Sequence, residues 1–247
     1  MLEINLPYHA HMKLNKFGFV KNGRPLYGWL IAIFTAIINI ANQFDINLIM
    51  YGEDGEAEYG GVQKLKSKAF FDIEFIKKIY LSDQYNNSLK ILNFKESHWW
   101  RLPKNSKTRM SHWSYFENWD SYRNFVISKK FMKYEENTKK NVGTYTNFGQ
   151  NDTLLYDLHC YLMYLKFGFG RATQDIGIDI RRGSMTREQG LQLAKIYDNE
   201  FPDYALNDYL DYFDIKEKTF FQIIDKHVNK KLFFKKKNMW VPKFLIN

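Results

Sequence analysis

The sequence predicts an α/β protein in which part of a parallel sheet is followed by a mainly helical region. Residues 46–51 form a short apolar run that is typical of a buried strand. An apolar segment at 29–41 comes four residues before this run, and the patterns after residue 80 are helical. We therefore place a partial α/β domain at 1–80 and a mainly helical C-terminal region at 81–247.

The first elements are predicted in strand–helix–strand order. Residues 2–6 alternate like a strand and stop at Pro7. Residues 13–28 contain Gly and Pro breakers, so we expect irregular backbone there. The segment 29–41 is apolar almost all round, and as a helix it must be buried on more than one side. Followed by the strand at 46–51, it makes a βαβ-like unit.

The predicted sheet is incomplete. A parallel strand as apolar as 46–51 needs neighbouring strands and helices on both faces. Sheets usually contain about four to six strands. Beyond residue 61 the sequence shows no second convincing buried strand. We therefore expect one end of a doubly wound sheet whose earlier strands are absent from this sequence.

The later elements are predicted from spacing and capping signals. Residues 70–80 fit a lysine-bearing amphipathic helix, 111–133 fit an aromatic-rich packed helical layer, and 135–151 fit a loop. Three helix starts carry capping residues. They are Asp152, for a helix ending at Gly168; Thr186 with Gln189, for a helix to about Asp198; and Asp214 with Glu217, for a helix to about His227.

Composition limits the compartment. A hydrophobic content of 45% is normal for a globular protein. One cysteine, Cys160, excludes an intrachain disulfide and a cysteine-rich zinc site. The N-terminus lacks the long apolar core of a signal peptide, and 29–41 is too short to span a bilayer. We expect a cytoplasmic protein with no membrane span.

The chain is basic, with 36 Lys+Arg against 27 Asp+Glu and a net charge of +9. The excess gathers at 226–243 and at 101–140. Such patches can attract nucleic acid, acidic membrane surfaces, nucleotides or nucleotide-sugars. The alternative is a solvated lysine-rich surface, which we favour over nucleic-acid binding.

The segment after the predicted strand is the first candidate site. Residues 52–61 hold four glycines and four carboxylates. In open α/β sheets, ligands bind where the carboxyl ends of strands open into loops. Mg²⁺ prefers one or two carboxylates together with phosphate oxygens. An acidic hairpin turn is an equal alternative, because Asp54-Gly55 is a good turn signal.

An arginine-rich segment is the second candidate site. Arg171, Arg181 and Arg182 lie among glycines, and guanidinium groups match phosphate oxygens. The alternative is pairing along a helix, since Arg171 and Asp175 are four residues apart and Asp179 and Arg182 are three apart. The spacing by itself slightly favours pairing.

Motifs spread over nearly the whole chain combine into a specific pattern. They are Tyr27–Phe34, Tyr51–Glu53 with Glu58–Gly61, His112–Phe116, Thr146–Phe148, Tyr164–Thr173, and Ile180–Gly183 with Arg187-Glu188. In combination they resemble the N-acetyl sugar amidotransferase family. These are ATP-pyrophosphatase (PP-loop) enzymes of surface-polysaccharide and lipopolysaccharide (LPS) sugar biosynthesis, including that of O-antigen.

The resemblance implies a reaction, cofactors and partners. Family members use ATP to activate the acetamido group of a nucleotide-linked sugar, and ammonia from a glutaminase partner converts it to an acetamidino group. The loop also resembles the pyrophosphate- and Mg²⁺-binding second loop of asparagine synthetases. The resemblance therefore assigns pyrophosphate or nucleotide binding to Gly52, Glu53, Glu56, Gly60, Gly61, Arg171, Arg181 and Arg182, and Mg²⁺ binding to Glu53 and Glu56.

The sequence departs from the family at its beginning. Family members open with a cysteine-rich metal-binding segment and a Ser-Gly-Gly-Lys-Asp-Ser phosphate loop, and this sequence has neither. Preorganised backbone donors of that kind contribute strongly to catalysis. We expect little activity from the chain alone unless a separate polypeptide supplies the missing N-terminal half. The alternatives are a truncated, non-catalytic partner-binding module and an RNA-binding PP-loop relative.

Overall fold

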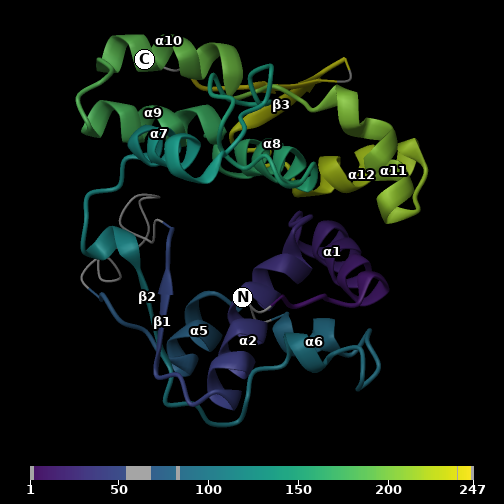
Figure 1. Cartoon of the computed structure of the whole chain (residues 1–247). Coiled ribbons are helices and arrows are strands. Elements are labelled where there is room, and N and C mark those ends of the chain that lie inside the picture. Colours follow the sequence, from purple (N-terminus) through teal and green to yellow (C-terminus); the bar gives the residue numbers. More distant parts are fainter. Residues whose placement is uncertain (1–2, 54–67, 82–83, 238, 246–247) are drawn as a thin grey trace. The chain divides into compact units, whose positions relative to one another are not determined.

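A computed structural model of the chain describes residues 3–53, 68–81, 84–237 and 239–245 (Figure 1). The chain folds into two compact units. Unit 1 comprises Met1–Lys21 and Leu26–Trp119, and unit 2 comprises Asn22–Pro25 and Asp120–Asn247. The domain boundary predicted after residue 80 marks the end of a proposed nucleotide-binding domain, and it stays a prediction.

Unit 1 opens with two helices, α1 (Tyr8–Asn22) and α2 (Tyr27–Gln43). The strand predicted at 2–6 is wrong, because the described residues 3–7 have no regular structure. The irregular segment predicted at 13–28 is confined to residues 23–26, and the rest of it is helical. Gly28 is one reason. A Cβ at Gly28 would lie 2.9 Å from Cδ2 of His11, so this glycine allows α1 and α2 to pack closely instead of breaking a helix.

Two short parallel strands follow in unit 1. β1 (Leu48–Tyr51) pairs with β2 (Arg109–His112), with Leu48 opposite Arg109 and Tyr51 opposite His112. The strand predicted at 46–51 is confirmed with a slightly later start, but its predicted burial is wrong, because Leu48 and Met50 are exposed. β2 was missed because its sequence, Arg-Met-Ser-His, contains one apolar residue and no strand pattern. Within the described residues, β1 and β2 form a two-stranded sheet.

The sheet packs on α2, which is buried on several sides as predicted. Tyr51 donates its hydroxyl to the carbonyl of Ile33 at 2.7 Å, which ties β1 to α2. Trp100 is completely buried, and its Nε1 donates to the carbonyl of Gly28 at 2.8 Å. The smaller elements of unit 1 are α5 (Ile73–Ile79), α6 (Tyr85–Leu89) and the 3₁₀ turns η1 (His98–Trp100) and η2 (Trp113–Tyr115).

Unit 2 is mainly helical and ends in a β-hairpin. Its elements are α7 (Ser121–Met132), α8 (Leu155–Phe167), α9 (Arg171–Arg181), α10 (Arg187–Tyr197), η3 (Asp203–Ala205), α11 (Leu206–Phe213), α12 (Glu217–His227), β3 (Phe233–Lys236) and β4 (Met239–Pro242). The hairpin was not predicted, because the lysine run at its turn hides the strand alternation. The fold class is therefore mixed α/β, as predicted at this coarser level.

The capping predictions for unit 2 had different outcomes. The capping box of Thr186 and Gln189 at the start of α10 is confirmed. Asp152 is not the cap of α8, which begins at Leu155. Asp214 does not cap α12: it has a φ of 47° and ends α11, where the left-handed conformation reverses the chain.

The helical layer predicted at 111–133 is confirmed as a helix only at Ser121–Met132, which form α7. Residues 111–120 instead contain the end of β2, η2 and irregular backbone. On α7, Tyr122 is 49% exposed and Phe131 is 71% exposed. Aromatic content by itself therefore did not indicate which side chains are buried.

The close contact of α9 and α10 leads to a stability prediction. A Cβ at Gly190 in α10 would lie 2.4 Å from Cγ2 of Ile176 in α9. Gly190→Ala is therefore expected to lower the free energy of unfolding by about 1–3 kcal/mol, because it overpacks this contact. Urea unfolding of the full chain measures the change.

Gly177→Ala in α9 is the matched control. Its nearest neighbour would be the flexible end of Arg181 at 3.3 Å. Alanine is the better helix former by about 1 kcal/mol, so this variant is expected to be at least as stable as the wild type. Equal effects of the two substitutions would contradict the packing described.

Candidate functional site

The acidic loop begins where β1 ends. Tyr51 is the last residue of β1 and lies opposite His112, the last residue of β2. Gly52 and Glu53 therefore follow the carboxyl ends of the parallel strands, where α/β sheets bind ligands. Glu53 is exposed. Burial, and after it the charge of Glu53, raises the pKa of the Tyr51 hydroxyl, so Tyr51 stays protonated.

The proposed metal ligands are described in part. Glu56, Gly60 and Gly61 lie outside the described residues. In the part of the chain that is described, no group of three or more His, Cys, Asp or Glu is placed to hold a metal ion. Because Glu56 is outside the described residues, the assignment of Glu53 and Glu56 to Mg²⁺ stays a prediction.

Arg171 is a buried structural residue at the start of α9. It is 3% exposed, and its Nη1 lies 3.4 Å from Oδ1 of Asp157 on α8. Its Nη2 donates to the carbonyl of Gly149, and its guanidinium lies 5.0 Å from the ring centre of Tyr156. Among the described carboxylates, Asp157 and not Asp175 is the ion-pair partner of Arg171. A phosphate would have to displace these contacts.

Arg182 and Arg181 lie at the other end of α9. Nε of Arg182 lies 2.8 Å from Oδ1 of Asp179, which confirms the predicted pairing at a spacing of three. Asp120 lies 3.4 Å from the same guanidinium. Arg181 is exposed. With a rise of about 1.5 Å per residue, Arg171 and Arg181 start about 15 Å apart, so the arginines do not converge on one group.

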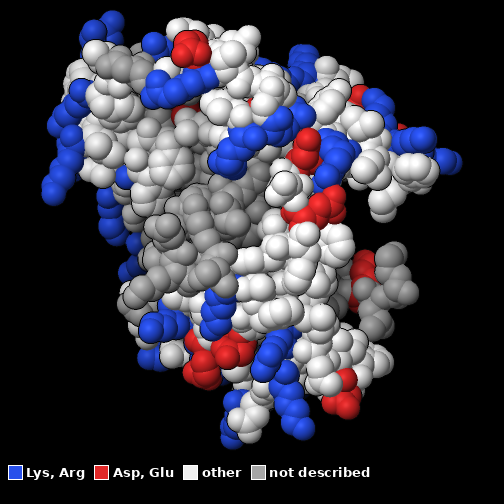
Figure 2. Space-filling view, turned by 90° about the vertical axis from the view of Figure 1, so that its left-hand side faces the viewer, with Lys and Arg blue, Asp and Glu red and all other residues white. Residues whose placement is uncertain are grey.

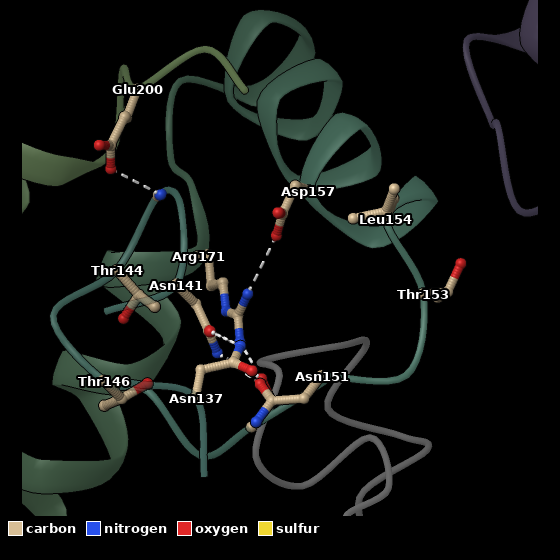
Figure 3. A network of polar contacts seen from close by, with 12 residues as sticks. Asn137, Asn141, Thr144, Thr146, Asn151, Thr153, Leu154, Asp157, Arg171 and Glu200 are labelled. Carbon is tan, nitrogen blue, oxygen red and sulfur yellow. Dashed lines mark hydrogen bonds and ion pairs between the residues drawn. The ribbon is translucent and has the colours of Figure 1, made fainter. Parts of the chain in front are cut away.

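Residues 137–151 form a loop that is closed by asparagine side chains (Figure 3). Asn141 is 8% exposed, and its Nδ2 donates to the carbonyl of Gly149 at 2.7 Å and to Oδ1 of Asn151 at 2.8 Å. Nδ2 of Asn137 donates to Oδ1 of Asn141 at 2.6 Å. The buried amide is thus satisfied, which fixes the shape of the loop.

Two carboxylates of α9 anchor this loop. Thr144 donates its hydroxyl to Oδ2 of Asp175 at 2.5 Å, and Thr146 donates to the same oxygen at 3.4 Å. Tyr145 donates its hydroxyl to Oδ2 of Asp179 at 2.6 Å. Burial raises the pKa of Asp175, although the hydrogen bond from Thr144 opposes this.

Glu200 ties the opposite side of the loop. Nζ of Lys140 lies 2.8 Å and 2.6 Å from the two carboxylate oxygens of Glu200. The backbone N–H of Gly143 donates to Glu200 at 2.9 Å. Both side chains are about one third exposed, so the pair contributes roughly 0.2–1 kcal/mol and is weakened by salt.

Asp198, two residues before Glu200, caps the N-terminus of α9 with its side chain. The N-cap residue of α9 is Gly170, which has no side chain. Asp198 accepts a hydrogen bond from the backbone N–H of Thr173 at 3.0 Å and one from its hydroxyl at 2.5 Å. A carboxylate at a helix N-terminus is stabilised by the helix dipole. Asp198 therefore fixes the position at which α9, and with it Arg171, begins.

A polar pocket of about 640 Å³ opens beside this network in unit 2. Its lining is rich in amides and hydroxyls and also holds two lysines and two carboxylates. The lining residues are Asn137, Thr138, Lys139, Lys140, Asn141, Val142, Gln150, Asn151, Thr153, Leu154, Asp157, Glu200 and Tyr204. Such a surface can donate and accept many hydrogen bonds with a neutral polar ligand.

Asp157 and Tyr204 connect the pocket to the buried ion pair. Tyr204 is 62% exposed and donates its hydroxyl to Oδ2 of Asp157 at 2.7 Å. Burial raises the pKa of Asp157, while Tyr204 and Arg171 act against this shift. The ring of Tyr204 thus presents an apolar face at the pocket while its hydroxyl is held in place.

The pocket was not predicted from the sequence. Residues 135–151 were correctly predicted as a loop, but no function was assigned to them. The signal that was available is the recurrence of Asn137, Asn141, Asn147 and Asn151 in one short segment. Asparagine side chains commonly hydrogen-bond to nearby backbone in turns, so this recurrence indicated an ordered loop.

Fold and site together define a mixed α/β protein whose C-terminal unit builds a polar pocket over a buried Arg–Asp pair. Residues 142–245 match the family model described as "LPS biosynthesis protein WbpG-like, C-terminal domain". The match covers less than half of the chain but includes Arg171, Asp157 and much of the pocket lining. No curated protein matches the chain.

A helix that crosses a bilayer must be both long and apolar. Among the described residues, no helix combines the length and the apolar character needed to cross a membrane. This includes α2, the most apolar helix of unit 1.

The buried carboxyl of Asp175 leads to a pH-dependent prediction. Its pKa is raised in the folded state, so it keeps a proton above about pH 4, where the unfolded chain loses one. Its contribution to stability is therefore present at low pH and is lost as the pH rises through the folded-state pKa. Asp175→Asn, which keeps an acceptor for Thr144, is expected to show a smaller loss of stability from about pH 4 to pH 7.

The measurement is the free energy of unfolding in urea at several pH values. Asp208→Asn, at an exposed position on α11, is the control for removal of one carboxyl. If Asp175→Asn and Asp208→Asn change the pH dependence equally, the buried carboxyl is not its source.

Proposed function

We propose that this chain acts in LPS, O-antigen or related surface-polysaccharide biosynthesis as an N-acetyl sugar amidotransferase-like protein. The proposed reaction converts the acetamido group of a nucleotide-linked sugar to an acetamidino group, using ATP and ammonia from a glutaminase partner. The observation that carries the proposal is the coincidence of the family match at 142–245 with the polar pocket. An activity of this kind would place the chain in the cytoplasm, where ATP is present.

The chemistry of the pocket supports a sugar ligand. Asn137, Gln150 and Asn151 offer amide donors and acceptors, which suit hydroxyl and acetamido groups. The exposed ring of Tyr204 offers a flat apolar face for a sugar ring. Lys139 is an exposed cation at the same pocket and suits the phosphates of a nucleotide-linked sugar.

We also propose residues that bind Mg²⁺ and pyrophosphate. Glu53 follows a parallel strand, which supports a role with Mg²⁺ and pyrophosphate together with Glu56 and the loop glycines Gly52, Gly60 and Gly61. Arg181 is the most accessible of the three arginines proposed for phosphate, because it is exposed, whereas Arg171 is buried and Arg182 is half-buried.

RNA binding is less well supported. Among the described residues visible in Figure 2, lysine and arginine side chains lie scattered among uncharged ones. A nucleic-acid interface usually gathers its basic residues along one surface. The distribution in view fits a solvated basic surface better.

The sugar-binding proposal is tested by calorimetry with two probes, UDP-N-acetylglucosamine and free N-acetylglucosamine. We expect the wild-type chain to bind both. Tyr204→Ala is expected to weaken both by about tenfold, because the ring face is lost. Lys139→Ala is expected to weaken the nucleotide-linked sugar while leaving the free sugar unchanged, because free N-acetylglucosamine carries no phosphate.

Phe131→Ala is the matched control, since Phe131 is exposed on α7 and does not line the pocket. Failure of the wild-type chain to bind either probe would remove the proposed sugar site. Equal losses in Tyr204→Ala and Phe131→Ala would do the same.

A second candidate function, a partner-binding module, is favoured by β1. Arg109 donates its backbone N–H to the carbonyl of Asn47, so the backbone groups of Leu48 and Met50 point to the other edge of β1, while their side chains lie on one face of the sheet. Their side chains are 46% and 42% exposed. Among the described residues no strand pairs with this edge. Parallel strands are normally paired and covered on both faces, so the edge suits further strands from another polypeptide.

The open edge leads to a prediction about association. If it binds further strands, the isolated chain is expected to self-associate, and Leu48→Lys with Met50→Lys is expected to shift it toward the monomer. Size-exclusion chromatography with light scattering measures the shift. Ile79→Lys, at another exposed apolar position of unit 1, is the control. A wild-type chain that is cleanly monomeric and melts cooperatively would argue against this function.

A further inference from the structure

We propose that the C-terminal hairpin of unit 2 is a docking surface for anionic lipid membranes. The hairpin consists of β3 and β4, with Phe234 opposite Val241 and Lys236 opposite Met239. The proposal does not depend on the sugar pocket, because it concerns another part of unit 2 and another kind of ligand.

The two faces of the hairpin differ. On the inner face Phe233 is 1% exposed and Trp240 is 9% exposed, and the ring centres of Phe233 and Tyr164 lie 5.1 Å apart. Trp240 also donates its Nε1 to Asp225 on α12 at 2.8 Å. These contacts attach the hairpin firmly to the helices, so its outer face is presented on a rigid support.

The outer face is apolar and exposed. Phe234 is 43% exposed and Met239 is 69% exposed, and Val241 lies beside Phe234 across the strands. Leu245, shortly after β4, is 83% exposed. Because side chains opposite each other in an antiparallel pair share one face, Phe234, Val241 and Met239 form one surface.

Lysines are frequent in the hairpin and in the segments next to it. Residues 228–247 contain six lysines and no Asp or Glu. The six are Lys230, Lys231, Lys235, Lys236, Lys237 and Lys243, all of them exposed. Lys235 pairs with Asp225 at 2.5 Å, whereas the described residues give no ion pair for Lys236 or Lys237. The surface therefore carries positive charge that its own neighbours do not neutralise.

This combination fits a lipid surface better than a nucleic acid. Apolar side chains among lysines are the features by which peripheral proteins enter the headgroup region of an anionic membrane. Phosphate recognition in nucleic acids favours the planar fork of arginine, and residues 228–247 contain no arginine. A partly exposed methionine and an exposed leucine likewise suit acyl chains and not bases.

The test is sedimentation of the full chain with vesicles of phosphatidylcholine, with and without phosphatidylglycerol. Binding is expected with phosphatidylglycerol at low salt, and little is expected with phosphatidylcholine alone. Lys236→Glu with Lys237→Glu is expected to weaken binding by more than tenfold, from about fivefold for each lysine removed. Phe234→Ser with Met239→Ser is expected to weaken it without any change of charge.

Lys216→Glu with Lys218→Glu is the control, because it makes the same change of charge at exposed positions near the start of α12. Circular dichroism checks that each variant is folded, which these exposed positions should permit. The proposal is overturned if no vesicles are bound, or if the control variant loses as much binding as the hairpin variant. It is also overturned if a single-stranded RNA is bound at a salt concentration that abolishes vesicle binding.

Discussion

The buried ion pair between Arg171 and Asp157 is the interaction on which the rest of unit 2 depends. It joins α9 to α8, and through the carbonyl of Gly149 it also holds the end of the pocket loop. Removing one partner of such a pair leaves an uncompensated buried charge, which typically costs about 3–5 kcal/mol. The pocket therefore rests on a buried guanidinium that already contacts Asp157 and the carbonyl of Gly149.

α10 and β2 show which elements can be predicted from the sequence and which cannot. The start of α10 could be predicted from local signals, because Thr186 and Gln189 are three residues apart and hydrogen-bond to each other. β2 has no local signal and exists because Met110 pairs beside a strand far away in the chain. The same distinction applies to the site: the pairing of Asp179 with Arg182 is local and was predicted, whereas the partner of Arg171 comes from another helix.

The candidate site was predicted less well than the fold for a related reason. Glu53 could be placed because it directly follows an apolar strand. The pocket is assembled from a loop, the start of α8 and the segment after α10, which come together by tertiary contacts. Each of its polar residues taken singly resembles ordinary surface. Its asparagines became informative when Asn141 proved to be buried and fully hydrogen-bonded.

The short segment from Asp198 to Tyr204 joins three tasks in one piece of backbone. Asp198 caps the start of α9, Glu200 binds Lys140 of the loop, and Tyr204 donates a hydrogen bond to Asp157. A shift of residues 198–204 would therefore change the contacts of α9, of the loop and of Asp157 together. One stretch of seven residues therefore couples the start of α9, the loop at 137–151 and the carboxylate of Asp157.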